Sequence, residues 1–346
     1  MSVISGVKDF FGLDIGTTAI RLVQLRGNGP NKSLVKYALV PVDQKLVLSD
    51  AKADQQKLAG VIKDLVAQSK ITTKNVCAGL PSQKVFCTVA DVDRLSKSDL
   101  DKTIRYQADT LIPTPITESK IDWAYLGDSP KDNNKVEILL SSVSNVFIEQ
   151  RLDMLEGIGL NVIAFEPDAL AVNRALVPID TATPKMIIDM GAHSTDLIIT
   201  VGDGPRLMRS IPTGSSTIIQ AAMQNLNIDE KQAEQFVYKF GLSQEKLEGQ
   251  IHNAIITTVD MLMNDIEKSI KFYQARYIKL PLERIIVTGG ASSLPEFPIY
   301  LVNKFSINVE IGNAWRNVVF PSDRQNELLS VSNHFGVAAG LAERTE

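Results

Sequence analysis

The sequence predicts an α/β protein of two lobes, with a small module inserted into the first lobe. Three observations lead to this fold class. Strand-like and helix-like segments alternate along the chain. The 346 residues, 44% of them hydrophobic, suffice for two compact units or one bilobed unit. A strand–acid–glycine cassette occurs twice, as LDIGTTAIRL at 13–22 and IDMGAHSTDL at 188–197.

The first lobe is assigned to three segments: 1–83, 151–182 and 325–346. FFGLDIGTTAIRLVQL at 10–25 is typical of two strands joined by a Gly-Thr-Thr turn. Residues 54–70 predict a helix, because their apolar side chains recur on one face. Residues 161–176 predict a strand followed by a helix, with Pro167 at the first helical position.

The inserted module is assigned to residues 84–150, where the order becomes strand, helix, strand, strand and helix. KVFCTVADV, KIDWAYLGD and KVEILLSSV read as its strands. The helix KSDLDKTIRYQADTLI is expected to begin after a serine cap, either Ser96 or Ser98. The following helix, NVFIEQRLDMLEGIG, is expected to end at Gly157.

The second lobe is assigned to residues 183–214 and 275–324, with a helical subdomain at 215–274. Its first part predicts a run of hairpin strands that mirrors the opening of the chain. VTGGASSLP at 287–295 predicts a buried strand, a Gly-Gly turn and a helix beginning at Ser292 or Ser293.

The chemistry of the cassette favours a metal-bound polyphosphate. A glycine after the strand lets backbone approach a ligand closely, and turn N–H groups can face phosphate oxygens. A carboxylate repels phosphate but suits hydrated Mg²⁺, which is bound by one or two carboxylates, waters and phosphates. Two such hairpins, carrying Asp14 and Asp189, would hold a triphosphate from both sides. No Walker A motif is present.

A nucleoside site would complete this arrangement. The backbone of Gly289-Gly290 carries no side chains, so a flat base or ribose can lie against it. The helical segment NDIEKSIKFY carries Asp265 and Lys268, which could supply hydrogen bonds to ribose or base.

Together these motifs resemble the actin/Hsp70/sugar-kinase superfamily, which implies an actin-like ATPase fold of two RNase H-like lobes. Asp14, Gly16, Thr17 and Thr18 match its first phosphate loop, and Asp189, Gly191, Ser194 and Thr195 its second. Gly289, Gly290 and Ala291 match its adenosine motif. EPDALAVNRAL and HFGVAAGLA are similar to its two connecting helices. The resemblance implies ATP and Mg²⁺ as ligands, with Asp14 and Asp189 holding the metal through water.

Within this superfamily the chain resembles the family of type IV pilus assembly proteins called PilM, relatives of the division protein FtsA. FFGLDIGTTAIRLVQL, LPSQKVF, AFEPDALAVNRAL and EKSIKFYQ carry the resemblance, which covers essentially the whole chain. It implies a cytoplasmic, ATP-binding component of the pilus inner-membrane platform, with a module of the 1C type and a helical subdomain of the 2B type. The implied partners are the pilus motor ATPases and the N-terminal cytoplasmic tail of a PilN-type membrane protein. The tail would dock between the module and the first lobe.

Glu166, just before a predicted helix, is the candidate catalytic residue, because it could orient a hydrolytic water. Alternatively, it is an acid favoured by the helix dipole. We expect ATP binding with slow turnover at most, since charge stabilisation is clearer in the sequence than a positioned nucleophile.

Composition excludes several other classes. The formal net charge of −4 gives no general attraction for nucleic acid or anionic lipid. Two cysteines without CxxC spacing indicate reduced thiols and argue against zinc. No run of about 18 apolar residues predicts a membrane span, and no secretory signal precedes the first strand. Residues 3–10 form either a short amphipathic segment or a leader packed beside that strand.

Two alternative functions belong to the same superfamily. A small-molecule kinase needs a general-base aspartate aimed at an acceptor hydroxyl, and no unassigned acid stands out near either hairpin. A filament-forming relative of FtsA is expected to end in an amphipathic membrane helix, whereas this sequence ends in GLAERTE.

Overall fold

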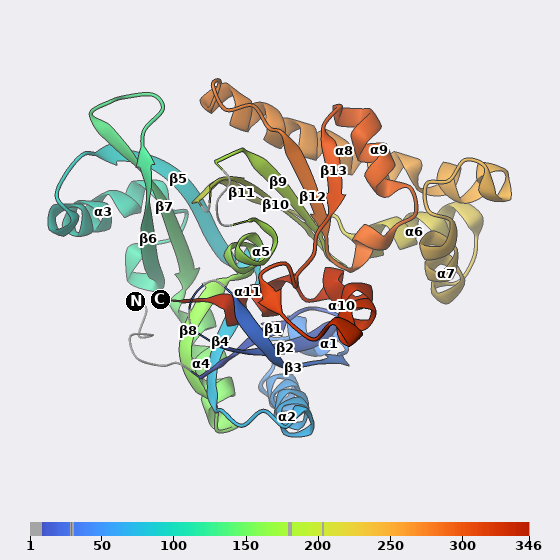
Figure 1. The fold of residues 1–346 in the computed structure, drawn as a ribbon, viewed down its shortest axis with the longest axis horizontal. Coiled ribbons are helices and arrows are strands. Elements are labelled where there is room, and N and C mark those ends of the chain that lie inside the picture. Colours follow the sequence, from blue (N-terminus) through green and yellow to red (C-terminus); the bar gives the residue numbers. More distant parts are fainter. Residues whose placement is uncertain (1–8, 28, 30, 179–181, 203, 346) are drawn as a thin grey trace.

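The computed structural model describes residues 9–27, 29, 31–178, 182–202 and 204–345. Most of the N-terminal segment that the sequence marks as amphipathic lies outside these residues. Figure 1 shows two large β-sheets, one above the other in this view, with two helices between them and a smaller sheet to one side. In the part of the chain that is described, no helix is long and apolar enough to span a bilayer.

The first sheet has the strand order β14-β3-β2-β1-β4-β8. Its strands are β1 (Phe11–Ile15), β2 (Ala19–Arg26), β3 (Lys32–Pro41), β4 (Asn75–Leu80), β8 (Asn161–Pro167) and β14 (Val318–Val319). β1, β2 and β3 form an antiparallel meander, and β4 and β8 follow in parallel on the other side of β1. Helices α2 (Lys52–Ser69) and α4 (Asn145–Gly157) share a core with this sheet, in which Leu58 and Leu155 pack around Leu13.

The second sheet repeats that plan in the order β11-β10-β9-β12-β13. Its strands are β9 (Lys185–Met190), β10 (Thr195–Val201), β11 (Gly204–Ile211), β12 (Arg284–Thr288) and β13 (Asn308–Ile311). Again a three-strand antiparallel meander is extended by two parallel strands beyond its first strand. The repeated cassette therefore lies at equivalent positions in two sheets of the same topology.

Helices on the outer side of the second sheet form the largest apolar core. They are α6 (Ser215–Leu226), α7 (Glu230–Phe240), α8 (Gln250–Arg276) and α9 (Phe297–Phe305). Two short helices are α1 (Gln44–Leu48) and α10 (Gln325–Val331).

Helices α5 (Asp168–Leu176) and α11 (Gly336–Glu343) lie between the two sheets, and their core includes Val23 of the first sheet and Ile187 of the second. The helices cross at very close range. A Cβ on Gly340 would lie 1.8 Å from the carbonyl oxygen of Ala171, so only glycine fits there.

The inserted module has the sheet order β5-β7-β6, from β5 (Val85–Asp93), β6 (Ser119–Asp128) and β7 (Lys135–Ser144), and a helix α3 (Lys97–Leu111). Ser96 caps α3 by accepting from Asp99 N at 3.3 Å. Buried Glu137 connects the module to the second lobe, accepting from Arg276 Nε at 2.9 Å and from the Tyr277 hydroxyl at 2.7 Å.

Several local boundaries differ from the sequence-based ones. Pro167 has φ −54° and ψ 130°, so it completes β8 and caps α5, which begins at Asp168. The helix after the Gly-Gly turn begins at Phe297, because residues 290–293 form a 3₁₀ turn. The expected limit of the module at residue 150 falls inside α4, and β14 pairs with β3 of the first sheet although residues 275–324 were assigned to the second lobe.

Candidate functional site

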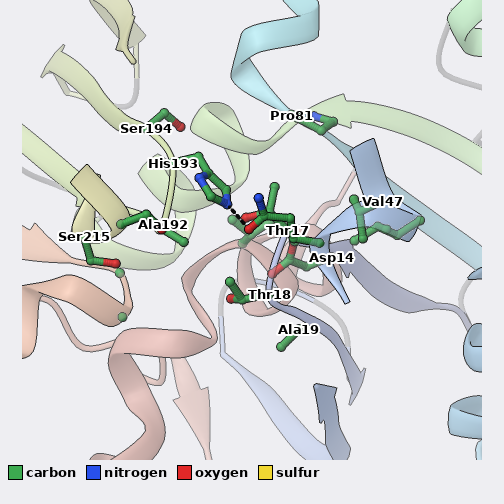
Figure 2. Close-up of a pocket in the computed structure, with 18 of the residues that line it drawn as sticks. Asp14, Thr17, Thr18, Ala19, Val47, Pro81, Ala192, His193, Ser194 and Ser215 are labelled. Atoms are coloured by element: carbon green, nitrogen blue, oxygen red, sulfur yellow. Dashed lines mark hydrogen bonds between the residues drawn. The ribbon is translucent and has the colours of Figure 1, made fainter. Parts of the chain in front are cut away.

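A cavity of about 1260 Å³ lies between the lobes, where the strands β1 and β9 end. Its wall includes both hairpin turns of the repeated cassette and the Gly-Gly turn after β12. Figure 2 shows Asp14, Thr17 and Thr18 of the first hairpin on one side, and Ala192, His193 and Ser194 of the second on the other. His193 Nε2 lies 2.6 Å from Gln44 Oε1, so this contact connects the two lobes across the cavity.

The cavity brings together most of the residues that the sequence singles out. Those on its wall are Asp14, Gly16, Thr17, Thr18, Asp189, Gly191, Ser194, Gly289 and Gly290. Thr195 lies beside it, buried, and its hydroxyl donates to the carbonyl of Thr213 at 2.7 Å. Ala291 belongs to the turn at 290–293, and its side chain is outside the described part of the structure.

Asp265 and Lys268 are not on the cavity wall. Lys268 Nζ donates to Asp265 Oδ1 at 3.0 Å, and Arg209 of β11 lies 3.8 Å from the same oxygen. In the helical subdomain the cavity is lined by α6 and α7 rather than by α8, and the residues from α7 are Glu230, Lys231, Glu234 and Tyr238. The spacing of Glu230, Glu234 and Tyr238 at every fourth residue is the signal that could have identified this face.

Glu166 also lies away from the cavity wall. Arg174 Nη1 and Arg344 Nη1 donate to its Oε2 at 3.2 and 3.0 Å, and Arg174 Nη2 donates to its Oε1. The acid that does reach the cavity is Asp168, two residues later and the first residue of α5. Its Oδ1 is fully enclosed and has no hydrogen-bond partner among the described residues.

The second turn is held in place by backbone hydrogen bonds. Gly191 N donates to Ser194 O at 2.9 Å, and Ser215 N donates to Gly191 O at 3.1 Å. The N-terminus of α6 therefore lies directly behind this turn. Because helix N-termini carry partial positive charge, this position favours an anion in the cavity.

Carboxylates from both hairpins crowd the cavity. Asp14 pairs with Arg21 across the first hairpin, where Arg21 Nη1 donates to Asp14 Oδ2 at 3.1 Å. At the equivalent place in the second hairpin, Asp189 faces Asp196, another acid of the wall. Burial raises the pKa of Asp189 to about 7, and the charges of Asp196 and Asp14 add to this effect. Burial likewise raises the pKa of Asp14, against the opposing charge of Arg21.

These residues fit a nucleotide with Mg²⁺. Carboxylates whose pKa values are raised by burial, as at Asp14 and Asp189, are stabilised by a cation, and Mg²⁺ requires only one or two of them when it retains waters and phosphate oxygens. Gly289 has φ +85°, and a Cβ there would lie 2.5 Å from Asp189 Oδ1. Only glycine lets the turn after β12 lie this close to β9, and both glycines of the turn line the cavity. Among the described residues, no cluster of three or more His, Cys, Asp or Glu is placed to hold an ion by itself.

Residues near the end of the chain support this turn. Gly289 N donates to Asn333 O at 3.0 Å, and Asn333 Nδ2 donates to Ser293 Oγ at 2.9 Å. His334 lies against Gly290 and lines the cavity. Asn333 belongs to none of the motifs, and His334 opens HFGVAAGLA, which matches a connecting helix. Only the tertiary fold reveals that both lie beside this turn.

Comparison with known proteins identifies the family. The model of a family described as type IV pilus assembly protein PilM matches residues 12–346. The chain belongs to this PilM family. A solved structure described as a PilM-PilN type IV pilus biogenesis complex contains a chain 25% identical to it, with a TM-score of 0.83, over 97% of this chain and 98% of that chain.

Two further structures share the fold at lower identity. EutJ, an ethanolamine utilization protein from Carboxydothermus hydrogenoformans, is 15% identical with a TM-score of 0.58, over 96% of this chain and 88% of its own. MreB5 of Spiroplasma citri, in a structure bound to AMPPNP, is 13% identical with a TM-score of 0.57, over 96% of this chain and 95% of its own. These likenesses establish an actin-like ATPase fold for this PilM family member. The family match favours the pilus hypothesis over the kinase and division-protein hypotheses.

Proposed function

We propose that the chain binds ATP with Mg²⁺ between its lobes, and that the nucleotide sets the arrangement of the lobes and hence the affinity for a pilus partner. One observation carries the proposal: Asp14 and Asp189, from hairpins 189 − 14 = 175 residues apart, line the same interlobe cavity. A ligand shifts such an arrangement only by binding its two forms differently, and a site built from both lobes meets that requirement.

In this proposal different residues bind the metal, the phosphates and the nucleoside. Asp14 and Asp189 would hold the hydrated metal, while the turns at 16–18 and 191–194 and the N-terminus of α6 face the phosphates. Gly289 and Gly290 would lie against the nucleoside, with α7 opposite. Mg²⁺ supplies charge neutralisation for the polyphosphate when bound. Asp168, rather than Glu166, is the acid placed to accept a hydrogen bond from water in this cavity, so we expect any slow ATP turnover to depend on Asp168.

The proposed partner is the N-terminal cytoplasmic tail of a PilN-type membrane protein. The support is family membership together with the solved PilM-PilN complex, whose PilM-like chain matches this one along nearly its full length. In this proposal the tail docks between the inserted module and the first lobe, and it brings the protein to the cytoplasmic face of the inner membrane, near the pilus motor ATPases. We propose no nucleic-acid partner.

Isothermal titration tests the nucleotide site. ATP with Mg²⁺ is titrated into wild-type protein and into Asp14→Ala, with Asp128→Ala on the exposed surface of the module as the control. Asp14→Ala removes a carboxylate proposed to hold the metal, and we expect it to weaken ATP binding by roughly tenfold or more. Asp128→Ala is expected to bind ATP as wild type does. If wild-type protein shows no binding of adenine nucleotides in this titration, the proposal is contradicted.

The same titrations, repeated with a PilN-type tail peptide, test the coupling. The peptide is expected to bind with different affinity in the presence and absence of ATP, and by linkage it changes the ATP affinity by the same factor. Failure of the peptide to bind in either state would count against the pilus function while leaving the nucleotide site intact.

A further inference from the structure

The cavity extends beyond the two hairpins to the helix α4 of the first lobe. Lys84, Phe147 and Arg151 form part of this wall. At about 1260 Å³ the cavity exceeds the roughly 300–1,000 Å³ of ordinary small-molecule pockets. The α4 wall is thus available to a ligand that the hairpins hold.

Arg151 is a buried cation with an unused donor. The residue is 6% exposed, and its Nη1 has no hydrogen-bond partner among the described residues. Its guanidinium lies 5.3 Å from the centroid of the Phe147 ring, and Lys84 Nζ lies 5.7 Å from the same ring.

Arg21, the other arginine of the wall, already donates to Asp14. Asp168 and Asp50 attract the Arg151 charge, yet its Nη1 makes no hydrogen bond with the described residues. A buried donor without a partner is costly, so Nη1 is available to an anion in the cavity.

The cavity wall carries more acidic than basic side chains, so an anionic ligand needs a cation on this wall. Among the described lining residues, eight are Asp or Glu and four are Lys or Arg. A polyphosphate entering this space meets repulsion wherever a metal ion does not screen it. Arg151 lies close enough to Asp168, the cavity acid at the start of α5, for the two charges to attract each other. Its charge lowers the pKa of Asp168, which the charges of Asp14 and Asp189 raise together with burial, the main cause.

We propose that Arg151, with Lys84 beside it, forms an oxyanion subsite for the terminal phosphate of a nucleotide held by the hairpins, or for inorganic phosphate at the same place. The inference rests on the proposed nucleotide binding. A guanidinium suits this task because it presents several donors to phosphate oxygens. The subsite distinguishes ATP from ADP, since ADP lacks the group that reaches it.

The position of α4 gives this contact a consequence. The helix begins at Asn145, immediately after Ser144 ends strand β7 of the inserted module. A phosphate bound by Arg151 is therefore about two helix turns from the module, and the partner tail is proposed to dock between this module and the first lobe. Nucleotide state is communicated to the module through α4.

Titration of three ligands tests the subsite: a nonhydrolysable ATP analogue, ADP, and ADP with inorganic phosphate, each with Mg²⁺. Arg151→Gln loses a charge-assisted hydrogen bond to the terminal phosphate. We expect its affinity for the ATP analogue to fall by roughly 10-fold to 100-fold and its affinity for ADP to stay within about threefold of wild type. Arg151→Lys is expected to retain part of the preference. If phosphate strengthens ADP binding in wild type and not in Arg151→Gln, the subsite also takes the free ion.

Arg94→Gln, which removes a cation from the exposed surface of the module, is the control and is expected to match wild type. An unchanged ratio of analogue to ADP affinity in Arg151→Gln overturns the inference, as does an equal loss for both nucleotides. If Arg151→Gln does not fold, Arg151→Lys and Lys84→Gln are measured instead, and an unchanged ratio in both has the same meaning. Wild-type protein that binds neither nucleotide contradicts the proposed function itself.

Discussion

Glu166 and Asp168 are two carboxylates separated only by Pro167, and the fold treats them in opposite ways. Glu166 is 2% exposed and accepts hydrogen bonds from Arg174 and Arg344. Asp168 is partly exposed to the cavity, and its enclosed Oδ1 has no partner among the described residues. Burial, followed by the charges of Asp14, Asp196 and Asp189, raises the pKa of Asp168 well above its usual range.

The difference separates structural charges from those available to a ligand. Glu166 joins β8 to α5 and to the end of α11, the two helices that lie between the lobes. Glu137 of the module is likewise a buried structural acid, because it accepts hydrogen bonds from Arg276 and Tyr277. Arg151 attracts Asp168 only electrostatically, and Asp168 Oδ1 has no hydrogen-bond partner among the described residues, although such a buried group destabilises the fold. This free oxygen is available to a ligand, metal or water in the cavity.

The largest expected effect is on Glu166. Replacing it by glutamine removes the charge that Arg174 and Arg344 share, and we expect a loss of about 2–4 kcal/mol in the free energy of unfolding, because breaking a buried ion pair leaves its partners unpaired. Urea unfolding measures this loss. ATP binding at 25 °C is expected to be unchanged while the protein remains folded. A variant as stable as wild type would show that the arginine contacts carry no net energy.

Sequence reasoning could locate the hairpins because each is a local pattern. Strand, acid, glycine and hydroxyl residues follow one another within ten positions, and Asp14 and Asp189 then meet because the same topology occurs twice. The Gly289-Gly290 turn is also a local pattern, and the family resemblance placed it in the same site.

The choice between Glu166 and Asp168 could not be made in this way. In a continuous strand, residues two apart point to the same face, so the two acids should share an environment. The helix that begins at Asp168 ends this alternation and turns the second acid into the cavity. The positions of Arg151 and Asp265 could not be predicted from the sequence either. Both are polar residues on helices, and only the packing of those helices decides that Arg151 is buried at the cavity while Asp265 pairs with Arg209.

Glu343 provides a carboxylate of intermediate character. It is 7% exposed and accepts from Asn317 Nδ2 at 3.2 Å, with the charges of Arg174 and Lys32 nearby. Burial raises its pKa from 4.5 to about 7. The folded state therefore keeps this proton at pH values where the unfolded state has lost it, and stability falls as pH rises from about 4.5 to about 7. The loss amounts to about 3 kcal/mol at most.

Glu343→Gln tests this contribution, because an amide does not titrate. Urea unfolding at a series of pH values from 4 to 8 is expected to show the variant gaining stability relative to wild type as pH rises. Other groups titrate in both proteins, so the difference between them isolates Glu343. Parallel curves would mean that the carboxyl is not held protonated.

The smallest effect, and the one of opposite sign, is expected for Asp168→Asn. Burial and the repulsion of three neighbouring acids outweigh the attraction of Arg151 for this charge, so removing it should increase the stability of the nucleotide-free protein by about 1 kcal/mol. The amide keeps the shape of the side chain, so Asp168→Asn and Glu166→Gln form a matched pair of neutral replacements two residues apart. Urea unfolding without nucleotide measures both. A loss of stability in both variants would mean that the attraction between Asp168 and Arg151 outweighs burial and repulsion, and the contrast between a structural acid and a ligand-facing acid would no longer hold.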